Sequence, residues 1–500
     1  MSSDNSFVSG DSSEGDPSDP AEARMAEIML QVALINGQQG TTDEDTKNSI
    51  KLQAEALLDT NNLSDSSSSD EDNTGEIALP TPRKKPKRAI RVDVEQSHWY
   101  KLFLAPEKVS EIRKEESTDD CNKDGTISYT FQMMFRVSMA IFDHLVDVAT
   151  RDGWYDNEAT DNAGRKVKDI RLLILGCLHV IGHDATFRVV ATNTGVSKDT
   201  QRRFFVRWIA KMASLKDEYI YLPRNEEELR LITDDYQRYG FPGCVGSIDV
   251  VHVDWNKCPA ELRNIYKGKD KYPCVGFQVI SSPRRFIQSI SKAFPGSLND
   301  KTTVKYEENV EAILSGEHWL GRCQWFANRL NGGVRCFTGC YLICDGGYLE
   351  WPCLLCPLEE AGNKYLRRYK RALAATRKDV ECTFGLIKKR FAWLKNCNNQ
   401  SRSDEIHNVF VTGCILHNLI LKEEGVLDKG TYAKSGGEME RLQESLGIGR
   451  TIVMSVLSPE EFHRIERSDF SNEWRERIHR VAEHMEACRK QALKEACQRY

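Results

Sequence analysis

Three acidic residues of the chain stand where they could serve metal-dependent chemistry on a phosphodiester. Asp249 lies inside a β-rich run, Asp345 directly follows a short apolar segment, and Glu381 lies on a helical pattern. Phosphodiester cleavage needs an activated water or 3′-hydroxyl and neutralisation of charge on the phosphate, which two Mg²⁺ ions about 3.5–4 Å apart supply together. Because Mg²⁺ prefers oxygen ligands and keeps several waters, a few carboxylates suffice. Acids placed on a central strand, at the end of its neighbour and on a packed helix can converge across one cleft.

The element that carries Glu381 is predicted as a helix over residues 377–394. One apolar face is formed by side chains at helical spacing, namely Val380, Phe384, Ile387 and Phe391. Glu381 lies beside that face, so its carboxylate should point along the edge of a core. Basic residues flank it, with Arg377 one turn before and Lys388, Lys389 and Arg390 two turns after. Alone, this pattern suits a solvated helix edge with i,i+4 ion pairs; the two upstream aspartates favour a metal-binding acid beside a phosphate backbone.

The order of elements around these acids predicts an α/β fold. The expected elements are a strand at 243–255 with Asp249 inside it, two strands at 274–281 and 286–291 joined by a short turn, a helix at 301–314, a strand at 340–344 ending in Asp345, and the helix with Glu381. This is the layout of an RNase H-like catalytic domain.

A helical region precedes the strands, with helices expected at 135–146 and 167–181. Residues 186–212 divide at Gly195 into a short apolar helix and a basic helix, and Ser197 is the candidate N-cap of the second. Phe204, Phe205 and Trp208 should face inward, and Lys198, Thr200, Arg202 and Arg203 outward. A helix, a glycine turn and a basic helix make a helix-turn-helix pattern, whose second helix can enter the major groove of double-stranded DNA. The alternative is an ordinary helical hairpin.

Charge is unevenly distributed along the 500 residues. Residues 1–76 hold 17 acidic and 3 basic side chains, a net charge of −14, while the whole chain carries −5, so residues 77–500 carry +9. A basic body suits a polyanionic partner. Residues 1–92 are predicted to be a disordered acidic tail that ends in a basic cluster. The cluster, Arg83, Lys84, Lys85, Lys87 and Arg88, predicts a nuclear localisation signal and a nuclear protein; the alternative is a nonspecific nucleic-acid contact.

The 16 cysteines are scattered through apolar segments, and the polar N-terminus does not resemble a signal peptide, so free thiols are expected. Cys353 and Cys356 could hold zinc together with Cys336 and Cys340, but packed thiols are the favoured alternative. No run of about 18 apolar residues is present, so no membrane span is expected.

Residues 472–499 are predicted to form an amphipathic helix with Trp474, Ile478, Val481, Met485 and Cys488 on one side. This stripe should dock on the body of the protein; the alternative is pairing between protomers of a homo-oligomer. The predicted domains are therefore the tail at 1–92, a helical DNA-binding domain at 93–235, the catalytic domain at 236–425 and a C-terminal extension at 426–500.

The motifs around the three acids resemble those of a known family. The motifs GSIDVVH around Asp249, DGGY from Asp345, and ECTFG from Glu381 with Lys388 and Arg390-Phe391 after it, are similar to the DDE signature of PIF/Harbinger transposases. Asp345 and Glu381 are 36 positions apart. PGSLND, ending at Asp300, resembles the loop before the second acid, and CILHN, ending at His417-Asn418, resembles the terminal motif. The resemblance covers roughly residues 125–425, and Val250 departs from it where a glycine is usual.

The resemblance implies that Asp249, Asp345 and Glu381 are catalytic and ligate two Mg²⁺ or Mn²⁺ ions in a DNA endonuclease or transposase. His252 and Asp300 are weaker candidates, whereas His417 and Asn418 should tie the last helix to the core. Lys198, Arg202, Arg203, Lys388 and Lys389 are the candidate DNA-binding residues. The resemblance also implies a possible Myb-like DNA-binding partner protein. The alternative function is a domesticated, non-catalytic DNA-binding protein; an RNA-cleaving enzyme is less favoured, because no RNA-binding module is recognisable.

Overall fold

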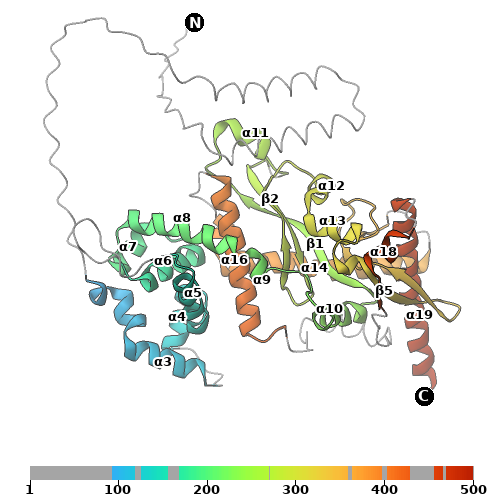
Figure 1. Ribbon diagram of the computed structural model, residues 1–500, viewed down its shortest axis with the longest axis horizontal. Coiled ribbons are helices and arrows are strands. Elements are labelled where there is room, and N and C mark those ends of the chain that lie inside the picture. Colours follow the sequence, from blue (N-terminus) through green and yellow to red (C-terminus); the bar gives the residue numbers. More distant parts are fainter. Residues whose placement is uncertain are drawn as a thin grey trace, which may run out of the picture. The chain divides into compact units, whose positions relative to one another are not determined.

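The computed structural model describes residues 93–118, 125–155, 168–269, 271–358, 363–396, 402–427, 455–465 and 469–498 (Figure 1). All of them belong to one compact unit, Ala89–Tyr500. The predicted acidic tail and the basic cluster at 83–88 lie outside the described residues. Within the described parts of the chain, no helix is long and apolar enough to cross a membrane.

The first half of this unit is helical. Its helices are α3 (Pro106–Glu116), α4 (Ile127–Phe135), α5 (Met139–Arg151), α6 (Ile170–His183), α7 (Phe187–Thr194), α8 (Lys198–Ser214), α9 (Lys216–Tyr219) and α10 (Glu226–Arg238). The predicted helix at 167–181 corresponds to α6. The predicted continuous helix at 135–146 is wrong, because α4 ends at Phe135 and Arg136 adopts a left-handed conformation with φ 63°. A new helix starts after Ser138, whose hydroxyl accepts a hydrogen bond from the Ile141 amide.

The main sheet has the strand order β3-β2-β1-β7-β8. Its strands are β1 (Cys244–Asp254), β2 (Cys274–Ser281), β3 (Ile287–Ile290), β7 (Tyr341–Ile343) and β8 (Leu354–Leu355), and the short β4 (Phe294–Pro295) also pairs with β2. The strands β1, β2 and β3 form an antiparallel meander, while β7 runs parallel to β1 and β8 parallel to β7. The predicted strands with Asp249 and before Asp345 are therefore neighbours, and the mixed α/β fold is confirmed.

Between the meander and β7 the structure differs from the expectation. The predicted helix at 301–314 is broken into α12 (Asp300–Thr303), a 3₁₀ turn (Val304–Tyr306) and α13 (Glu308–Ser315). A second, three-stranded antiparallel sheet of order β6-β5-β9 follows, which was not expected from the sequence. It consists of β5 (Cys323–Asn328), β6 (Val334–Thr338) and β9 (Ser455–Val456).

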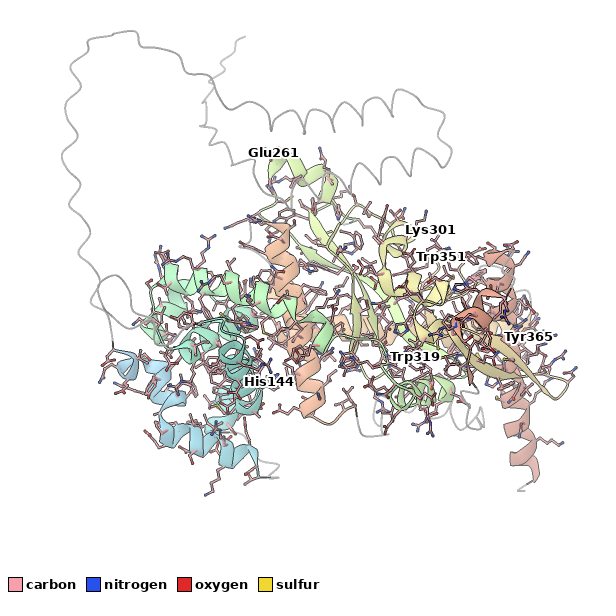
Figure 2. All side chains as sticks on the ribbon, in the orientation of Figure 1. His144, Glu261, Lys301, Trp319, Trp351 and Tyr365 are labelled. Carbon is pink, nitrogen blue, oxygen red and sulfur yellow. The ribbon has the colours of Figure 1, made fainter. Side chains whose placement is uncertain are left out.

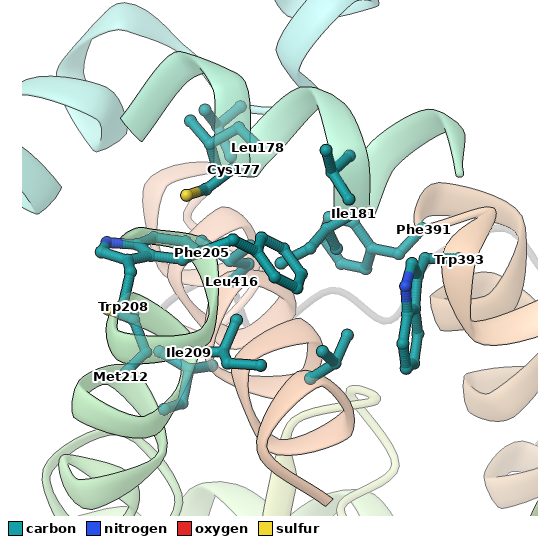
Figure 3. Close-up of a cluster of buried hydrophobic side chains, with 14 of the residues drawn as sticks. Cys177, Leu178, Ile181, Phe205, Trp208, Ile209, Met212, Phe391, Trp393 and Leu416 are labelled. Carbon is teal, nitrogen blue, oxygen red and sulfur yellow. The ribbon is translucent and has the colours of Figure 1, made fainter. Parts of the chain in front are cut away.

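The C-terminal helices pack onto both halves. They are α14 (Lys364–Arg390), α15 (Trp393–Asn396), α16 (Ser403–Glu423), α18 (Pro459–His463) and α19 (Phe470–Gln498). Figure 3 shows Phe205 and Trp208 of α8, Leu416 of α16 and Trp393 of α15 in one buried apolar cluster. Val251 and Phe277 of the sheet belong to the same cluster. The helical half and the sheet thus share a core.

The C-terminal helix α19 docks on the body, as predicted. All five residues of its apolar stripe are buried, namely Trp474, Ile478, Val481, Met485 and Cys488. The indole Nε1 of Trp474 donates to the Leu354 carbonyl at 2.8 Å, and Arg477 Nη1 donates to the Gly339 carbonyl at 2.8 Å. The helix therefore contacts β8, the strand next to the one that precedes Asp345.

Candidate active site

Asp249 and Asp345 occupy corresponding places on two adjacent parallel strands. Ser247 of β1 is paired with Ile343 of β7, and each aspartate follows its paired residue by two positions. Asp249 faces the same side of the sheet as Ser247, because side chains two residues apart on a strand share a face. Asp249 lies in the middle of β1, whereas Asp345 lies just beyond the end of β7. The fold therefore brings the first two predicted acids together from positions 96 residues apart in the sequence.

Glu381 lies on α14, which packs across β1 and β2. The link to the strand acid runs through Arg377, one helical turn earlier. Nη1 of Arg377 lies 3.1 Å from Oδ2 of Asp249, and Nη2 lies 2.8 Å from Oε1 of Glu381. Arg377 and Asp249 are largely buried, while the Glu381 side chain is 48% exposed. One guanidinium thus joins two of the three predicted acids.

The buried position of Asp249 changes its acidity. Burial raises the pKa of its carboxyl to about 6 from an ordinary value of 3.8, which outweighs the opposing attraction of Arg377. The nearby carboxylates of Asp345 and Asp300 raise this pKa further, because a second negative charge disfavours ionisation. Bound cations would relieve this repulsion and stabilise the ionised form.

Asp300 is a fourth acid of the site. A Cβ atom placed on Gly347 would lie 2.9 Å from Oδ2 of Asp300 and 3.0 Å from Oδ1 of Asp345, so the two carboxylates flank this glycine and would have to shift to admit a side chain. The Gly347 amide donates to Oδ1 of Asp345 at 2.7 Å. Burial and the charge of Asp345 both raise the pKa of Asp300. Figure 2 labels Lys301, the exposed residue that follows Asp300 on α12.

The donor chemistry suits a hard divalent cation, since the site offers carboxylate oxygens alone. Among the residues that the structure describes, no group of three or more His, Cys, Asp or Glu side chains is gathered closely enough to hold a metal ion. The guanidinium of Arg377 instead supplies the positive charge between Asp249 and Glu381. A cation is therefore already accommodated at this position, and it is one that the chain itself provides.

Comparisons with known proteins identify relatives of this chain. Residues 217–428 match the model of the family described as plant transposon protein. The chain is 19% identical over 297 residues to "Protein ALP1-like" of Arabidopsis thaliana, a match that spans 59% of this chain and 71% of the relative. It is 23% identical over 233 residues to "Putative nuclease HARBI1" of Rattus norvegicus, spanning 46% of this chain and 60% of the relative. This chain is related to the Harbinger-type DDE transposases. No solved structure matches it significantly.

The region matched by the transposon family model contains all four acids and two of the three lysines predicted to bind DNA, Lys388 and Lys389. Lys388 is half-buried, and its ammonium donates to the His252 carbonyl at 2.7 Å. Burial lowers the pKa of Lys388. Lys389 is exposed. The structure thus places Lys388 as a contact between α14 and β1, and only Lys389 at the surface.

The terminal motif holds α16 to the sheet, as expected. Asn418 accepts a hydrogen bond from the Ile287 amide at 2.9 Å and donates to the Ile287 and Tyr219 carbonyls at 2.8 and 2.9 Å. His417 contacts the Arg285 carbonyl through Nε2, at 3.0 Å. Both side chains are buried, so they join elements of the core.

The predicted helix-turn-helix has the expected local form, and it precedes the region matched by the transposon family. Helix α7 ends at Gly195, whose φ of 65° is left-handed, and Ser197 caps α8 by accepting from the Thr200 amide. The three aromatic residues predicted to face inward are buried, and Lys198, Arg202 and Arg203 are exposed. Thr200 is only half-exposed.

Two further basic residues lie on the exposed side of α8. These are Arg207 and Lys211, which continue the i+4 row from Arg203 over two further turns and could have been found by extending the helical pattern. A cavity of about 670 Å³ lies beside this helix; its lining includes Tyr155, Leu173, Phe204, Arg202, Arg203 and Arg207. The basic side of α8 is therefore hollowed and not flat.

The cysteines predicted as a possible zinc site are separated by the fold. Cys353 and Cys356 flank β8 and are buried, and Cys340 is buried just before β7, whereas Cys336 is exposed on β6. The thiols of Cys344 and Cys356 contact each other, and burial raises the pKa of Cys344 well above its ordinary value. These features agree with packed, protonated thiols, the favoured alternative.

Proposed function

We propose that this chain is a divalent-metal-dependent DNA endonuclease of transposase type. The main sheet supports an RNase H-like catalytic domain, since an antiparallel three-stranded meander is extended by two strands parallel to its first strand. The observation that carries the proposal is the placement of Asp249 within β1 and of Asp345 just past the end of the adjacent parallel strand β7, with Glu381 joined to Asp249 through one arginine. Each relative's name adds weight only to the family, not to the activity.

Asp249, Asp345 and Glu381 would hold Mg²⁺ or Mn²⁺, as the pair of ions typical of two-metal sites, with Asp300 beside them. Bound metal would supply charge neutralisation at the phosphate and an activated water. In the reaction, the water oxygen bonds to phosphorus, the bond from phosphorus to the leaving oxygen breaks, and one proton of the water ends on that oxygen. The half-buried position of Asp249 would limit access of bulk water.

Substrate binding is assigned to the helical half. The exposed basic row of α8, with Lys198, Arg202 and Arg203, would contact double-stranded DNA, and Lys389 on α14 would contact the backbone near the acids. The basic cluster at 83–88 would direct the protein to the nucleus. A Myb-like partner protein and homo-oligomer formation remain hypotheses that rest on the family resemblance and the sequence.

The test is nicking of a labelled duplex taken from the DNA that flanks the gene. Reactions contain Mg²⁺, Mn²⁺ or EDTA, and each is repeated with Asp345→Asn. We expect metal-dependent nicking that the variant loses, because an amide is a poorer ligand for a hard cation than a carboxylate. Glu308→Gln serves as a matched control, because this exposed acid on α13 pairs with Lys292 outside the site.

A second function is favoured by one observation, the bridging position of Arg377. A guanidinium that neutralises Asp249 and Glu381 could replace a metal permanently, as expected of a domesticated, non-catalytic DNA-binding protein. If wild type and Asp345→Asn bind the duplex equally and neither nicks it, with or without a Myb-like partner, the non-catalytic function is the better one.

A further inference from the structure

We propose that Gln278, on β2, is a positioning residue that holds the two segments carrying Asp345 and Asp300 in place. The proposal rests on the function proposed above, because it concerns the same four acids. Gln278 was not singled out in the sequence, where a glutamine inside a strand carries no evident signal. In the structure it is fully buried, with an exposed fraction of 0%.

Both ends of the Gln278 amide are engaged. Nε2 donates to the Tyr348 hydroxyl at 2.5 Å, and Oε1 accepts from the Thr303 hydroxyl at 2.9 Å. Tyr348 and Thr303 are themselves buried, each with 2% exposed. Burial, with the charges of nearby acids, raises the pKa of Tyr348 well above its ordinary value, so its hydroxyl keeps its proton at neutral pH. The amide therefore joins two uncharged hydroxyl groups.

These two hydroxyl groups belong to the segments that bear the acids. Tyr348 follows Asp345 by three residues, and Thr303 follows Asp300 by three residues on α12. Gly347 lies between the two carboxylates, and a Cβ atom built on it would lie 2.9 Å from Asp300 Oδ2 and 3.0 Å from Asp345 Oδ1. A shift of either segment would change the separation of Asp300 and Asp345 directly.

The strand pairing also places Gln278 close to the backbone of Asp249. Gln278 is paired with Val250 on β1, the residue next to Asp249. The backbone of Gln278 is fixed as well, since its amide donates to the Ser291 hydroxyl at 2.9 Å. A rigid strand thus carries one buried amide that reaches both acid-bearing segments. Leaving a buried amide without hydrogen-bond partners costs free energy. This arrangement therefore resists displacement of either segment.

The consequence is geometric precision at the proposed metal site. Mutating residues that orient metal ligands without binding the metal themselves typically lowers metal affinity about 10- to 100-fold. Here the orientation is indirect, through the backbone between Tyr348 and Asp345 and between Thr303 and Asp300. Gln278 needs no contact with metal or substrate to exert it.

The experiment measures Mn²⁺ binding to the purified full-length chain by isothermal titration calorimetry, together with urea unfolding. The variants are Gln278→Leu, Tyr348→Phe and Thr303→Val, and Thr303→Ser restores the hydroxyl. The matched control is Tyr236→Phe, which removes another fully buried tyrosine hydroxyl, one that contacts the Ser247 hydroxyl at 3.0 Å.

We expect Gln278→Leu to weaken Mn²⁺ binding about tenfold or more, with Tyr348→Phe and Thr303→Val each weakening it and Thr303→Ser restoring it. The effects of Tyr348→Phe and Gln278→Leu should be less than additive, because both substitutions remove the same hydrogen bond, the one between the Gln278 amide and the Tyr348 hydroxyl. Tyr236→Phe should change stability but not Mn²⁺ affinity.

Two failures are distinguishable. If wild type binds Mn²⁺ and all three variants bind it as tightly as Tyr236→Phe does, Gln278 is merely structural and the inference is overturned. If wild type binds no Mn²⁺, the proposed function fails, and the inference fails with it. Should Gln278→Leu not fold, the single hydroxyl deletions at Tyr348 and Thr303 decide the question.

Discussion

The Arg377 guanidinium lies 3.1 Å from the carboxylate of Asp249, so the acid deepest in the site is neutralised by the protein itself. The same guanidinium pairs with Glu381. A divalent ion that binds these two acids must therefore displace Arg377 or share them with it. Arg377 therefore competes with a metal ion for these two carboxylates. Once displaced, its guanidinium could bind a phosphate of the substrate.

Replacing Arg377 by alanine should tighten Mn²⁺ binding. Removing a competing, charge-assisted contact from a largely buried carboxylate is expected to raise affinity by roughly tenfold. Nicking by the variant should nevertheless fall, since the cation next to the phosphate is lost. Calorimetry with Mn²⁺ and the nicking assay measure the two effects. Lys378→Ala removes the same charge from an exposed neighbour on α14 and should change neither. Unchanged Mn²⁺ affinity in Arg377→Ala would show that the arginine does not compete.

Asp249 should contribute more to the stability of the metal-free protein at acidic pH than at neutral pH, because protonation relieves the cost of its buried charge. Its pKa is about 6 in the folded chain and 3.8 ordinarily, so between these values the folded state binds the proton more tightly than the unfolded state does. The stability due to this proton is fully present below about pH 4 and is lost as pH rises through about 6, a change of about 3 kcal/mol.

Urea unfolding of wild type and Asp249→Asn at several pH values measures this contribution. The difference between the two proteins is the quantity of interest, because buried His407 and His417, whose pKa values are lowered to about 4 by burial, change wild-type stability in the opposite direction. Mn²⁺ affinity should also fall below pH 6, since the proton and the metal compete for one carboxylate. A difference between the proteins that does not vary with pH would contradict the raised pKa.

The basic row of α8 should contribute to DNA binding in a salt-dependent manner. Arg202→Ala with Arg203→Ala is expected to weaken binding and to flatten the slope of log affinity against log salt by about 2, if each arginine contacts one phosphate. Fluorescence anisotropy of a labelled duplex at several salt concentrations measures the slope. The matched control removes two exposed arginines of α10, Arg230 and Arg238, and should leave the slope unaltered. Equal slopes for the two double variants would exclude α8 as the DNA-contacting helix.

Strong local signals made most of the site predictable. The strand around Asp249, the strand before Asp345 and the amphipathic helix with Glu381 each follow from the periodicity of apolar residues, and the structure contains all three. Arg377 was noticed as a neighbour of Glu381, because i,i+4 spacing on a helix is a local property. Its contact with Asp249 spans 128 residues and depends on how α14 crosses β1, which no local pattern encodes.

Three features were not predicted correctly from the sequence, each for a physical reason. The break at Arg136 is a left-handed turn at a residue type that rarely adopts it, so the apolar period continues across a real helix end. The β5–β6 hairpin did carry a signal, Asn331-Gly332-Gly333 between two apolar runs, and it was missed. Gln278 had none, because its role arises only when β2, α12 and the loop after β7 meet.

Trp474 should be a principal contact that holds α19 to the body. Its side chain is buried and its indole donates to the Leu354 carbonyl on β8, so Trp474→Ala removes both a large apolar contact and a hydrogen bond. We expect a loss of about 3–5 kcal/mol in the free energy of unfolding, measured by urea denaturation followed by circular dichroism. Phe470→Ala on the same helix removes an exposed aromatic ring and should cost less than about 1 kcal/mol. Because β8 adjoins β7, the loosened helix should also weaken Mn²⁺ binding at Asp345. Equal stability of the two variants would mean that α19 is not docked in solution, and its apolar stripe would then be free to pair with a second copy of the chain, which sedimentation would detect.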